Sequence, residues 1–403
     1  MVHLSKILRA IVNLSNENRL LLACIDIGIS DEKLARVNSL ASLPIKWDKL
    51  FDAALSQGIV PVVYNCLKDI PDRARVPEDT MEKFKMAYHG NVARNMYLHS
   101  ELERILSVFD EKGIEVILLK GAALSKTVYR DIGLRQMSDI DLLVRQDKLD
   151  RVKEIMSGLN YIVKGGDRSE AWYKENHFHL PPFIHKDKSV IVEIHWEVAQ
   201  DTLGIDVNKW WERAKKTKLG EASALIPSPE DMILHLCVSL YHSNYHQAAL
   251  RGFCDIIFTI RFHAEQMNWA RFREAVSQSE IARPVYSLLH LVRKYFDDGQ
   301  FLSWVKAEPV DLKFSAMIER ILFSSEDVPY GLLMRSLAAD TLWKRTKMIF
   351  AGPLFPSRKE MSKRYPVRPD SLWVYLYYVY RPVDLVVKYG RSFLKMLCFR
   401  GPE

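Results

Sequence analysis

The chain has 403 residues, of which 48% are apolar and 27% are charged, and its formal net charge is +7. This length suits roughly two or three domains, and the composition is ordinary for soluble globular proteins. The five cysteines are odd in number and show no Cys-x-x-Cys spacing, which argues against a disulfide framework and against a zinc site.

The first residues are not typical of a secretory signal, because Asn13, Asn16 and Asn18 interrupt any continuous apolar segment. No run of about 18 apolar residues occurs in the sequence, so we expect no membrane-spanning helix. The expected location is therefore the cytoplasm, and the C-terminal tail adds the alternative of a peripheral position at the inner face of the membrane.

Residues 1–112 are rich in Leu, Ala and Lys and contain four prolines, which predicts a region of short helices. The stretch from Glu82 to Lys112 has no proline and is followed by Gly113, a pattern typical of a long helix with a glycine C-cap. We therefore expect an N-terminal helical region that leads into the first strand.

Residues 113–200 are expected to alternate strand, helix, strand, helix and strand. The aliphatic run from Ile114 to Leu119 predicts a buried strand, and Ala122 to Tyr129 predicts a helix. Gly121 lies at the turn between them, where a glycine lets backbone N–H groups approach an anion and the helix N-terminus favours negative charge. Lys120 would add a positive charge, so this turn is a candidate phosphate site.

Two aspartates, Asp139 and Asp141, are separated by one residue and open an apolar run. In a strand, residues two apart point to the same side of the sheet. Two carboxylates held that close repel each other unless a cation neutralises them, and Mg²⁺ or Mn²⁺ prefers oxygen ligands. The pattern therefore predicts a metal site. A solvated strand edge is the alternative, and it would be favoured without the Lys-Gly turn upstream.

Arg135 and Ser138 precede these aspartates and are candidate contacts for phosphate oxygens, because a guanidinium offers a planar fork of donors. An ion pair at the surface is the more common role of a single arginine. Farther along, Val190 to Glu197 has a period of two that places Glu193, His195 and Glu197 on one face of a strand. His195 is a candidate ligand or proton carrier, but a hydrogen-bonded strand histidine is the favoured interpretation.

Three segments carry a family resemblance: Leu-Lys-Gly-Ala-Ala-Leu at 119–124, Tyr-Arg-Asp-Ile-Gly-Leu-Arg at 129–135 and Ser-Asp-Ile-Asp-Leu-Leu-Val at 138–144. In this order they resemble the uncharacterised nucleotidyltransferase family of bacterial proteins. That family is a branch of the DNA polymerase β-type nucleotidyltransferase superfamily and is similar to the nucleotidyltransferase toxins of abortive-infection systems. The resemblance covers most of residues 40–300.

The resemblance implies an α+β fold in which a small mixed-sheet core is flanked by N-terminal and C-terminal helical regions. It also implies a metal-dependent enzyme that transfers a nucleoside monophosphate from an NTP such as ATP to an acceptor hydroxyl. In that family plan Asp139, Asp141 and a third carboxylate hold Mg²⁺ or Mn²⁺, and the turn at Gly121 holds the triphosphate. Lys120, Arg135 and Ser138 remain the candidate nucleotide contacts that the residues themselves suggest. Glu193 is the first choice for the third carboxylate and Glu197 the reserve. The acceptor, a small molecule, a protein or an RNA, is left open.

The chain departs from the family plan at the turn, where Gly121-Ala122 replaces Gly-Ser and a phosphate-binding hydroxyl is lost. Lys120 could compensate, because a charge-assisted contact is about twice as strong as a neutral one. The substitution motivates an alternative function: a catalytically degenerate nucleotide-binding or adaptor protein that keeps the fold without turnover.

Residues 229–297 return to helical periodicity, starting with Ser228-Pro229, and residues 201–330 are expected to form a C-terminal helical domain. On that helix His235, His242 and His246 share a face and could bind a metal, but packing in an interhelical seam is the favoured interpretation. Asp255 lies among apolar residues, either as a hydrogen-bond acceptor between helices or facing a substrate cleft.

Residues 331–403 form a basic, aromatic tail. From Thr341 to Glu403 there are 13 Lys or Arg and four Asp or Glu, a local net charge of +9, so the rest of the chain carries 7 − 9 = −2. Apolar, aromatic and cationic residues together are typical of a helix at an anionic membrane surface or of a groove for a polyanion. Packing against the helical domain is an equal alternative. A membrane-surface factor in envelope or surface-polymer assembly is thus a further hypothesis.

Overall fold

The structure is a computed structural model that describes residues 14–25, 30–72, 75–163, 173, 177–200, 203–243, 245, 248–296, 305, 308, 310–323, 356 and 358–397. The N-terminal part consists of short helices: α2 (Asn16–Cys24), α3 (Asp31–Ala41), α4 (Trp47–Ser56) and α5 (Val60–Leu67). Ser15 and Ser30 cap α2 and α3 by accepting hydrogen bonds from backbone N–H groups of the first turn. Gly58, with φ +66°, makes the turn between α4 and α5.

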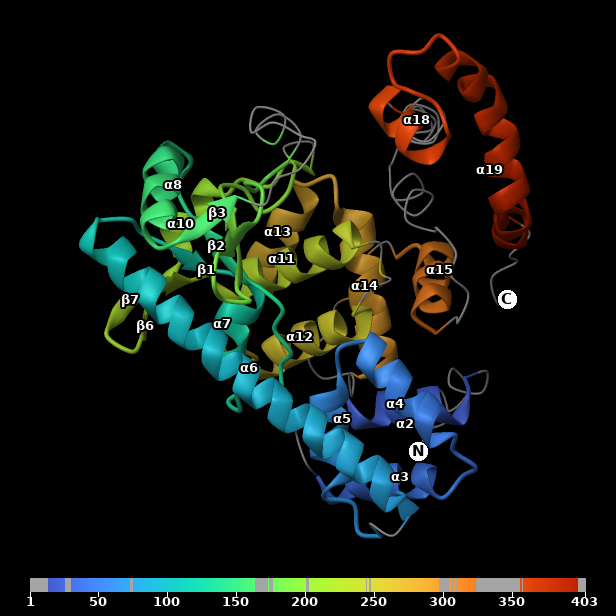
Figure 1. Ribbon diagram of the computed structural model, residues 1–403. Coiled ribbons are helices and arrows are strands. Elements are labelled where there is room, and N and C mark those ends of the chain that lie inside the picture. Colours follow the sequence, from blue (N-terminus) through green and yellow to red (C-terminus); the bar gives the residue numbers. More distant parts are fainter. Residues whose placement is uncertain are drawn as a thin grey trace.

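The long helix α6 (Glu78–Glu111) runs diagonally along the molecule and connects the N-terminal helices to the sheet (Figure 1). It begins after Pro77, four residues before the predicted start, and the chain leaves it through Gly113 at φ +68°. The predicted helix and its glycine end are confirmed. Five polar side chains of α6 are buried, and three of them contact segments that carry the site: Asn91, Asn95 and His99.

Within the described residues, seven strands form one sheet in the order β3-β4-β5-β2-β1-β7-β6. The strands are β1 (Ile117–Leu118), β2 (Ile140–Leu143), β3 (Tyr161–Val163), β4 (Phe183–His185), β5 (Ile191–His195), β6 (Lys215–Leu219) and β7 (Ala222–Ile226). β2 pairs with β5 and β1 pairs with β7 in parallel, whereas the remaining pairs are antiparallel. A mixed sheet flanked by helices, as the sequence predicts, is confirmed.

The sheet extends beyond the expected core. β6 and β7 form a hairpin within residues assigned to the C-terminal helical domain, and Gly220 at φ +59° makes its turn. β6 is an edge strand with three exposed lysines, and such charges protect an edge from pairing with other chains but obscure an apolar alternation. The expectation of helices alone after residue 200 was therefore wrong, although a domain boundary there stays a prediction.

Helices cover the sheet and extend from it (Figure 1). They are α7 (Lys120–Thr127), α8 (Leu149–Gly158), preceded by the 3₁₀ turn η2 (Gln146–Lys148), α10 (Asn208–Arg213), α11 (Pro229–His242), α12 (Ala249–Phe262), α13 (Trp269–Ser277), α14 (Ala282–Tyr295) and α15 (Leu312–Phe323). The Ser228 hydroxyl accepts a hydrogen bond from the Asp231 N–H, so α11 starts where the sequence predicts. One apolar core extends from the N-terminal helices through the sheet to α15.

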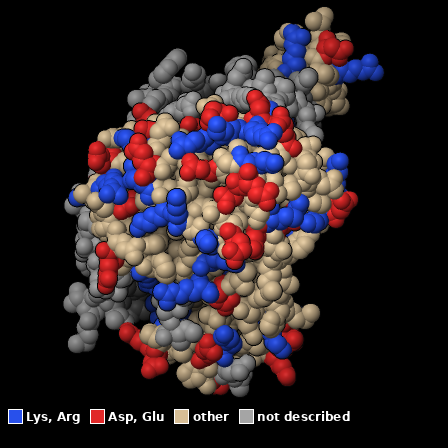
Figure 2. All heavy atoms as spheres, turned by 90° about the vertical axis from the view of Figure 1, so that its left-hand side faces the viewer, with Lys and Arg blue, Asp and Glu red and all other residues tan. Residues whose placement is uncertain are grey.

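Two helices near the C-terminus, α18 (Arg358–Arg364) and α19 (Val374–Leu397), stand apart from the other helices in Figure 1. They pack on each other through a small cluster of buried side chains. Among the described helices, none is both long enough and apolar enough to cross a bilayer. The face of the molecule in Figure 2 carries acidic and basic side chains interspersed, without a large area of one sign.

Candidate metal centre

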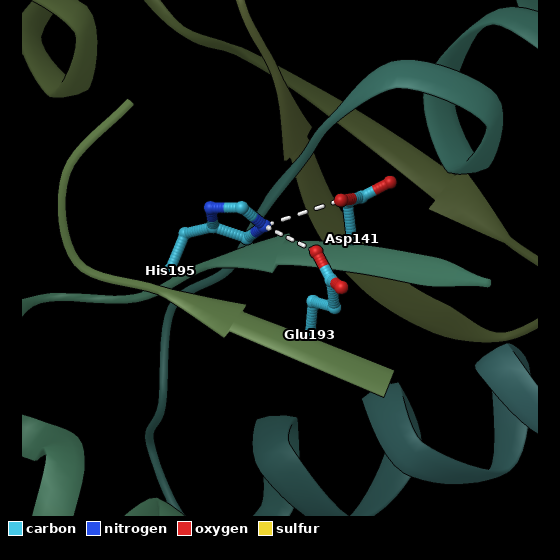
Figure 3. A group of neighbouring side chains, drawn as sticks. All are labelled: Asp141, Glu193 and His195. Carbon is cyan, nitrogen blue, oxygen red and sulfur yellow. Dashed lines mark hydrogen bonds and ion pairs between the residues drawn. The ribbon is translucent and has the colours of Figure 1, made fainter. Parts of the chain in front are cut away.

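The parallel pairing of β2 with β5 brings three side chains together. The register sets Asp141 opposite Glu193 and Leu143 opposite His195. Because alternate residues of a strand point to the same side, Glu193 and His195 leave β5 on one face, and Asp141 leaves β2 on that face as well. Figure 3 shows the three side chains converging above the two strands.

The three side chains are close enough to share one cation. His195 Nε2 lies 3.1 Å from Asp141 Oδ1 and 3.6 Å from Glu193 Oε2. One ligand atom from each residue lies within 4.8 Å of the others. Neighbouring ligands around an ion with bonds of about 2.1 Å are roughly 3 Å apart, so this donor set fits a divalent cation. No second group of this kind occurs in the part of the chain that the structure describes.

Lys120 neutralises the most buried carboxylate of the group. Its ammonium Nζ lies 2.7 Å from Asp141 Oδ1. Lys120 is the first residue of α7 and has φ +43°, an unusual backbone angle for a residue with a side chain. Such strain persists only where the surrounding structure enforces it, and the ion pair with Asp141 is one interaction that does so.

Opposite charges within the group favour the ionised forms of its side chains. Burial alone would raise the pKa of the Asp141 carboxyl, but the Lys120 ammonium and the His195 imidazole outweigh burial, so this pKa lies well below its ordinary range. Burial opposes a charge on His195 too, yet hydrogen bonds to Asp141 and Glu193 raise the pKa of its imidazole. The pKa of Glu193 is lowered, because the hydrogen bond from His195 outweighs burial.

Asp139 occupies the rim of the group. It is half-buried and directly precedes β2, and its carboxylate accepts a hydrogen bond from the Ser138 hydroxyl at 3.1 Å. Burial, followed by the negative charge of Asp141, raises the pKa of Asp139. A second cation near Asp139 would lower this pKa again. The structure thus places both predicted aspartates at the site, but His195 rather than Asp139 completes the close group.

The reserve acid, Glu197, lies two residues beyond the end of β5. It does not belong to the close group, whereas Glu193 does. The side chain of Glu193 is 23% exposed, whereas those of Asp141 and His195 are 3% and 1% exposed. Glu193 is therefore the member of the group that solvent, or a ligand, reaches most readily.

Side-chain amides of α6 hold the segment that leads into β2. Asn95 donates to the carbonyl oxygens of Ile132 and Arg135, and Asn91 donates to that of Gly133 at 2.6 Å. These amides satisfy carbonyl groups of a buried irregular segment, which would otherwise lose hydrogen bonds to water. The sequence analysis missed their role. Two asparagines four residues apart within the pattern of a long helix were the available signal.

The side chains of Arg135 and Met137 approach the backbone of Gly121 so closely that no side chain fits at this position. A Cβ atom at this position would collide with Arg135 Nη1 and would lie 2.9 Å from Met137 Cγ. The expected reason for this glycine, access of an anion to backbone N–H groups, is thus replaced in this structure by the packing of Arg135. Ala122, where the family plan has serine, is buried in the apolar core.

Arg135 forms a buried ion pair instead of offering a free phosphate clamp. Its Nε and Nη2 donate to the two carboxylate oxygens of Asp255 at 3.1 and 2.9 Å. Tyr129 OH donates to the same carboxylate at 2.7 Å. The predicted phosphate contact of Arg135 does not fit this geometry, because Asp255 occupies its fork of donors. Asp255 is a hydrogen-bond acceptor that ties α12 to the segment before β2.

A second guanidinium, that of Arg251 in the first turn of α12, has no such partner within the described residues. Its Nη1 donates to the Gln136 carbonyl oxygen at 3.3 Å, and Arg135 Nη1 donates to the same oxygen. Burial, followed by the positive charge of Arg135, lowers the pKa of Arg251. Among the described residues, no carboxylate lies within ion-pair distance of it. Arg251 is therefore a cation near Asp139 without an acidic partner in the described part of the chain, and no pattern in the sequence indicated it.

The histidines of α11 do not form a metal group. His235 is buried, neither of its ring nitrogens has a hydrogen-bond partner, and its ring lies edge-on to that of Trp210. Burial and the nearby Lys120 charge lower the pKa of His235 far below its ordinary value. His242 stacks on Phe178, and His246 lies outside the described residues. The group of potential ligands in the described chain includes neither His235 nor His242.

Comparison with known proteins identifies a sequence family. Residues 44–297 match the family described as uncharacterised nucleotidyltransferase. Among solved structures, the chain is similar to an antigenic nucleotidyltransferase-like protein from Paracoccidioides brasiliensis, with 14% sequence identity and a TM-score of 0.34. This similarity covers 53% of the present chain and 94% of the other. No curated protein matches the chain.

Proposed function

We propose that this chain, which belongs to the uncharacterised nucleotidyltransferase family, transfers a nucleoside monophosphate from an NTP to an acceptor hydroxyl. The observation that carries the proposal is the register of β2 and β5, which sets Asp141 opposite Glu193 and brings His195 to the same face. Two carboxylates on adjacent strands of a mixed sheet also support a place in the DNA polymerase β-type superfamily.

The residues fit a divalent cation, Mg²⁺ or Mn²⁺. Asp141 and Glu193 would hold it, Asp139 would add a third carboxylate from the rim, and His195 would orient the carboxylates or bind directly. The fit rests on the spacing of the donor atoms and on a buried carboxylate that already requires a positive partner, Lys120. A bound cation would neutralise the phosphates and make the α-phosphorus more electrophilic.

Two basic side chains would receive the phosphates. The Lys120 side chain is 24% exposed, so its ammonium can leave Asp141 and move toward a bound triphosphate. Arg251 would take the role that the sequence assigned to Arg135, because, unlike Arg135, it has no acidic partner among the described residues. Placing fixed cations where negative charge develops lowers the barrier of phosphate chemistry. Arg251 thus offsets part of the loss of the serine at Ala122.

Glu193 would activate the acceptor hydroxyl by taking its proton. Its carboxylate is the most exposed of the close group, so an incoming hydroxyl can reach it. The carboxylate takes the proton as the hydroxyl oxygen forms its bond to the α-phosphorus. The bond between the α-phosphorus and the bridging oxygen to the β-phosphate breaks, and pyrophosphate leaves with those electrons. The product is the acceptor carrying a nucleoside monophosphate.

This assignment predicts a difference between the two glutamates of the same segment. Glu193→Gln should reduce nucleotidyl transfer about a hundredfold, since both a metal ligand and a proton acceptor are lost. Glu197→Gln is the matched control and should leave the rate nearly unchanged, because Glu197 lies outside the close group. Initial rates measured side by side decide the assignment, and the reverse ranking would move the role to Glu197.

Incubation with each of the four NTPs, labelled at the α-phosphate, tests the proposal. The full chain is supplied with Mg²⁺ or Mn²⁺ and with fractions of a cell extract that contain small molecules, protein or RNA. We expect transfer of the α-label to one acceptor class, together with release of pyrophosphate. Tight NTP binding without transfer in any fraction would instead support the alternative, a nucleotide-binding adaptor without turnover.

A further inference from the structure

An uncharged apolar surface on α19 is the largest concentration of exposed apolar side chains in the described chain. Nine of the seventeen large apolar side chains that are exposed there fall within residues 372–387. We call them the α19 apolar face: Leu372, Trp373, Tyr375, Leu376, Val379, Tyr380, Val383, Val386 and Val387. Single exposed apolar residues are normal on protein surfaces, but a contiguous set marks an interaction site.

Helical geometry makes this set continuous. Leu376, Val379, Val383 and Val386 follow one another in steps of three and four residues, which keeps them on one side of the helix. Leu372 and Trp373 lie in the turn just before α19. The aromatic residues and Val387 lie beside this row and widen it. The α19 apolar face is wider than the apolar seam by which two helices pair in a coiled coil. No charged residue interrupts the face between residues 372 and 380 or between 385 and 387.

The opposite side of α19 fixes which way the apolar face points. Val374 packs with Met361 and Tyr365 in the small cluster between α18 and α19. Arg381 is buried, and Tyr365 OH donates to Asp384 at 2.7 Å. These contacts bind one side of α19 to α18. The α19 apolar face is consequently turned to the outside, where its side chains are between 48% and 80% exposed.

The segment that carries the apolar face has a positive net charge. Residues 358–397 contain nine Lys or Arg and three Asp or Glu, a net charge of 9 − 3 = +6. The Arg358 guanidinium lies over the ring of Tyr375, 4.8 Å from its centroid, and the Lys388 side chain is 58% exposed. Cations along the border of an apolar stripe with Trp and Tyr are typical of a helix that lies in the headgroup region of a bilayer.

We infer that α19 attaches the protein to a bilayer surface that contains anionic phospholipid, with the α19 apolar face inserted among the headgroups. The charge of +6 disfavours a second copy of the chain, because two such segments would repel each other. A polyanion such as RNA would contact cations rather than an uncharged face of valines and leucines. This surface is independent of the metal centre and of the proposed reaction.

Flotation of the full chain with vesicles tests the inference. The vesicles contain phosphatidylcholine alone or with about 30% phosphatidylglycerol. The test variant combines Val379→Asn with Val386→Asn, and the control combines Leu55→Asn with Leu312→Asn, which changes two exposed apolar residues elsewhere. We expect the unmodified chain and the control to bind the anionic vesicles, and the test variant to bind about tenfold more weakly or less. Binding should also weaken with salt.

Two results would overturn the inference. One is equal flotation of the test variant and the control. The other is a combination of two observations: no chain binds either vesicle, and the unmodified chain forms a concentration-dependent dimer in sedimentation that the test variant does not form. The occupant of the α19 apolar face would then be a second copy of the chain. Far-ultraviolet circular dichroism and MgATP affinity should be the same for all chains, so that loss of fold is recognised.

Discussion

Replacing Asp139 and Asp141 together by asparagine is expected to reduce the rate of nucleotidyl transfer about a thousandfold or more, while the fold persists. A bound cation supplies several kcal/mol of stabilisation to the reacting phosphates, and each loss of about 1.4 kcal/mol slows a reaction tenfold. Asparagine has the shape of aspartate but lacks the charge that attracts the cation. Titration calorimetry should show that the double variant no longer has a divalent-dependent affinity for ATP.

The matched control is Asp147→Asn with Asp150→Asn, two aspartates just beyond β2 that are 66% and 82% exposed. This pair should retain both activity and metal dependence. Thermal unfolding of the site variant should stay close to that of the unmodified chain, because Lys120 is partly exposed and its ammonium can turn to solvent when its partner loses charge. Unchanged affinity for MgATP in the site variant would remove the metal centre from the account.

Asp255→Asn is expected to lower the free energy of unfolding by about 3–5 kcal/mol, the usual effect of breaking a buried ion pair from one side. Arg135 is 6% exposed, so its guanidinium would remain buried with no carboxylate to neutralise it. The hydrogen bond from Tyr129 to the same carboxylate would also weaken. Urea unfolding followed by circular dichroism measures the change.

An exposed pair provides the comparison for this variant. Asp48 and Lys83 form an ion pair across 3.0 Å with side chains that are 85% and 49% exposed. Asp48→Asn should change stability by less than about 1 kcal/mol, since water screens such pairs. Adding Arg135→Gln to Asp255→Asn should recover part of the loss, because no unpaired charge stays buried. A loss below about 1 kcal/mol for Asp255→Asn alone would show that Arg135 finds another partner.

The local parts of the site followed from sequence because they depend on neighbouring residues. A period of two places Glu193 and His195 on one face of a strand, and it predicts Asp139 and Asp141 on one side of another, although Asp139 directly precedes β2. The start of α11 and the glycine after α6 were likewise set by local backbone rules. Periodicity does not determine the register, that is, which residue of one strand lies opposite which residue of the neighbouring strand. The register that pairs Asp141 with Glu193 is a property of the folded sheet.

The parts that the sequence did not predict depend on contacts between distant residues. Arg135 and Asp255 are 120 positions apart, and neither has a neighbour in sequence that indicates the other. The absence of an acidic partner for Arg251 among the described residues is visible only once Asp255 is found with Arg135. The hairpin of β6 and β7 was missed because the lysines of an exposed edge strand hide the apolar alternation.

The position of a bound metal ion tests the central claim most directly. A crystal of the full chain with Mn²⁺ and a non-hydrolysable NTP analogue, measured at the manganese absorption edge, should give an anomalous peak within about 2.3 Å of carboxylate oxygens from both Asp141 and Glu193. Lys120 Nζ should then contact the phosphates instead of lying 2.7 Å from Asp141 Oδ1. A peak elsewhere, or no peak with the Lys120–Asp141 pair intact, would contradict the proposed metal centre.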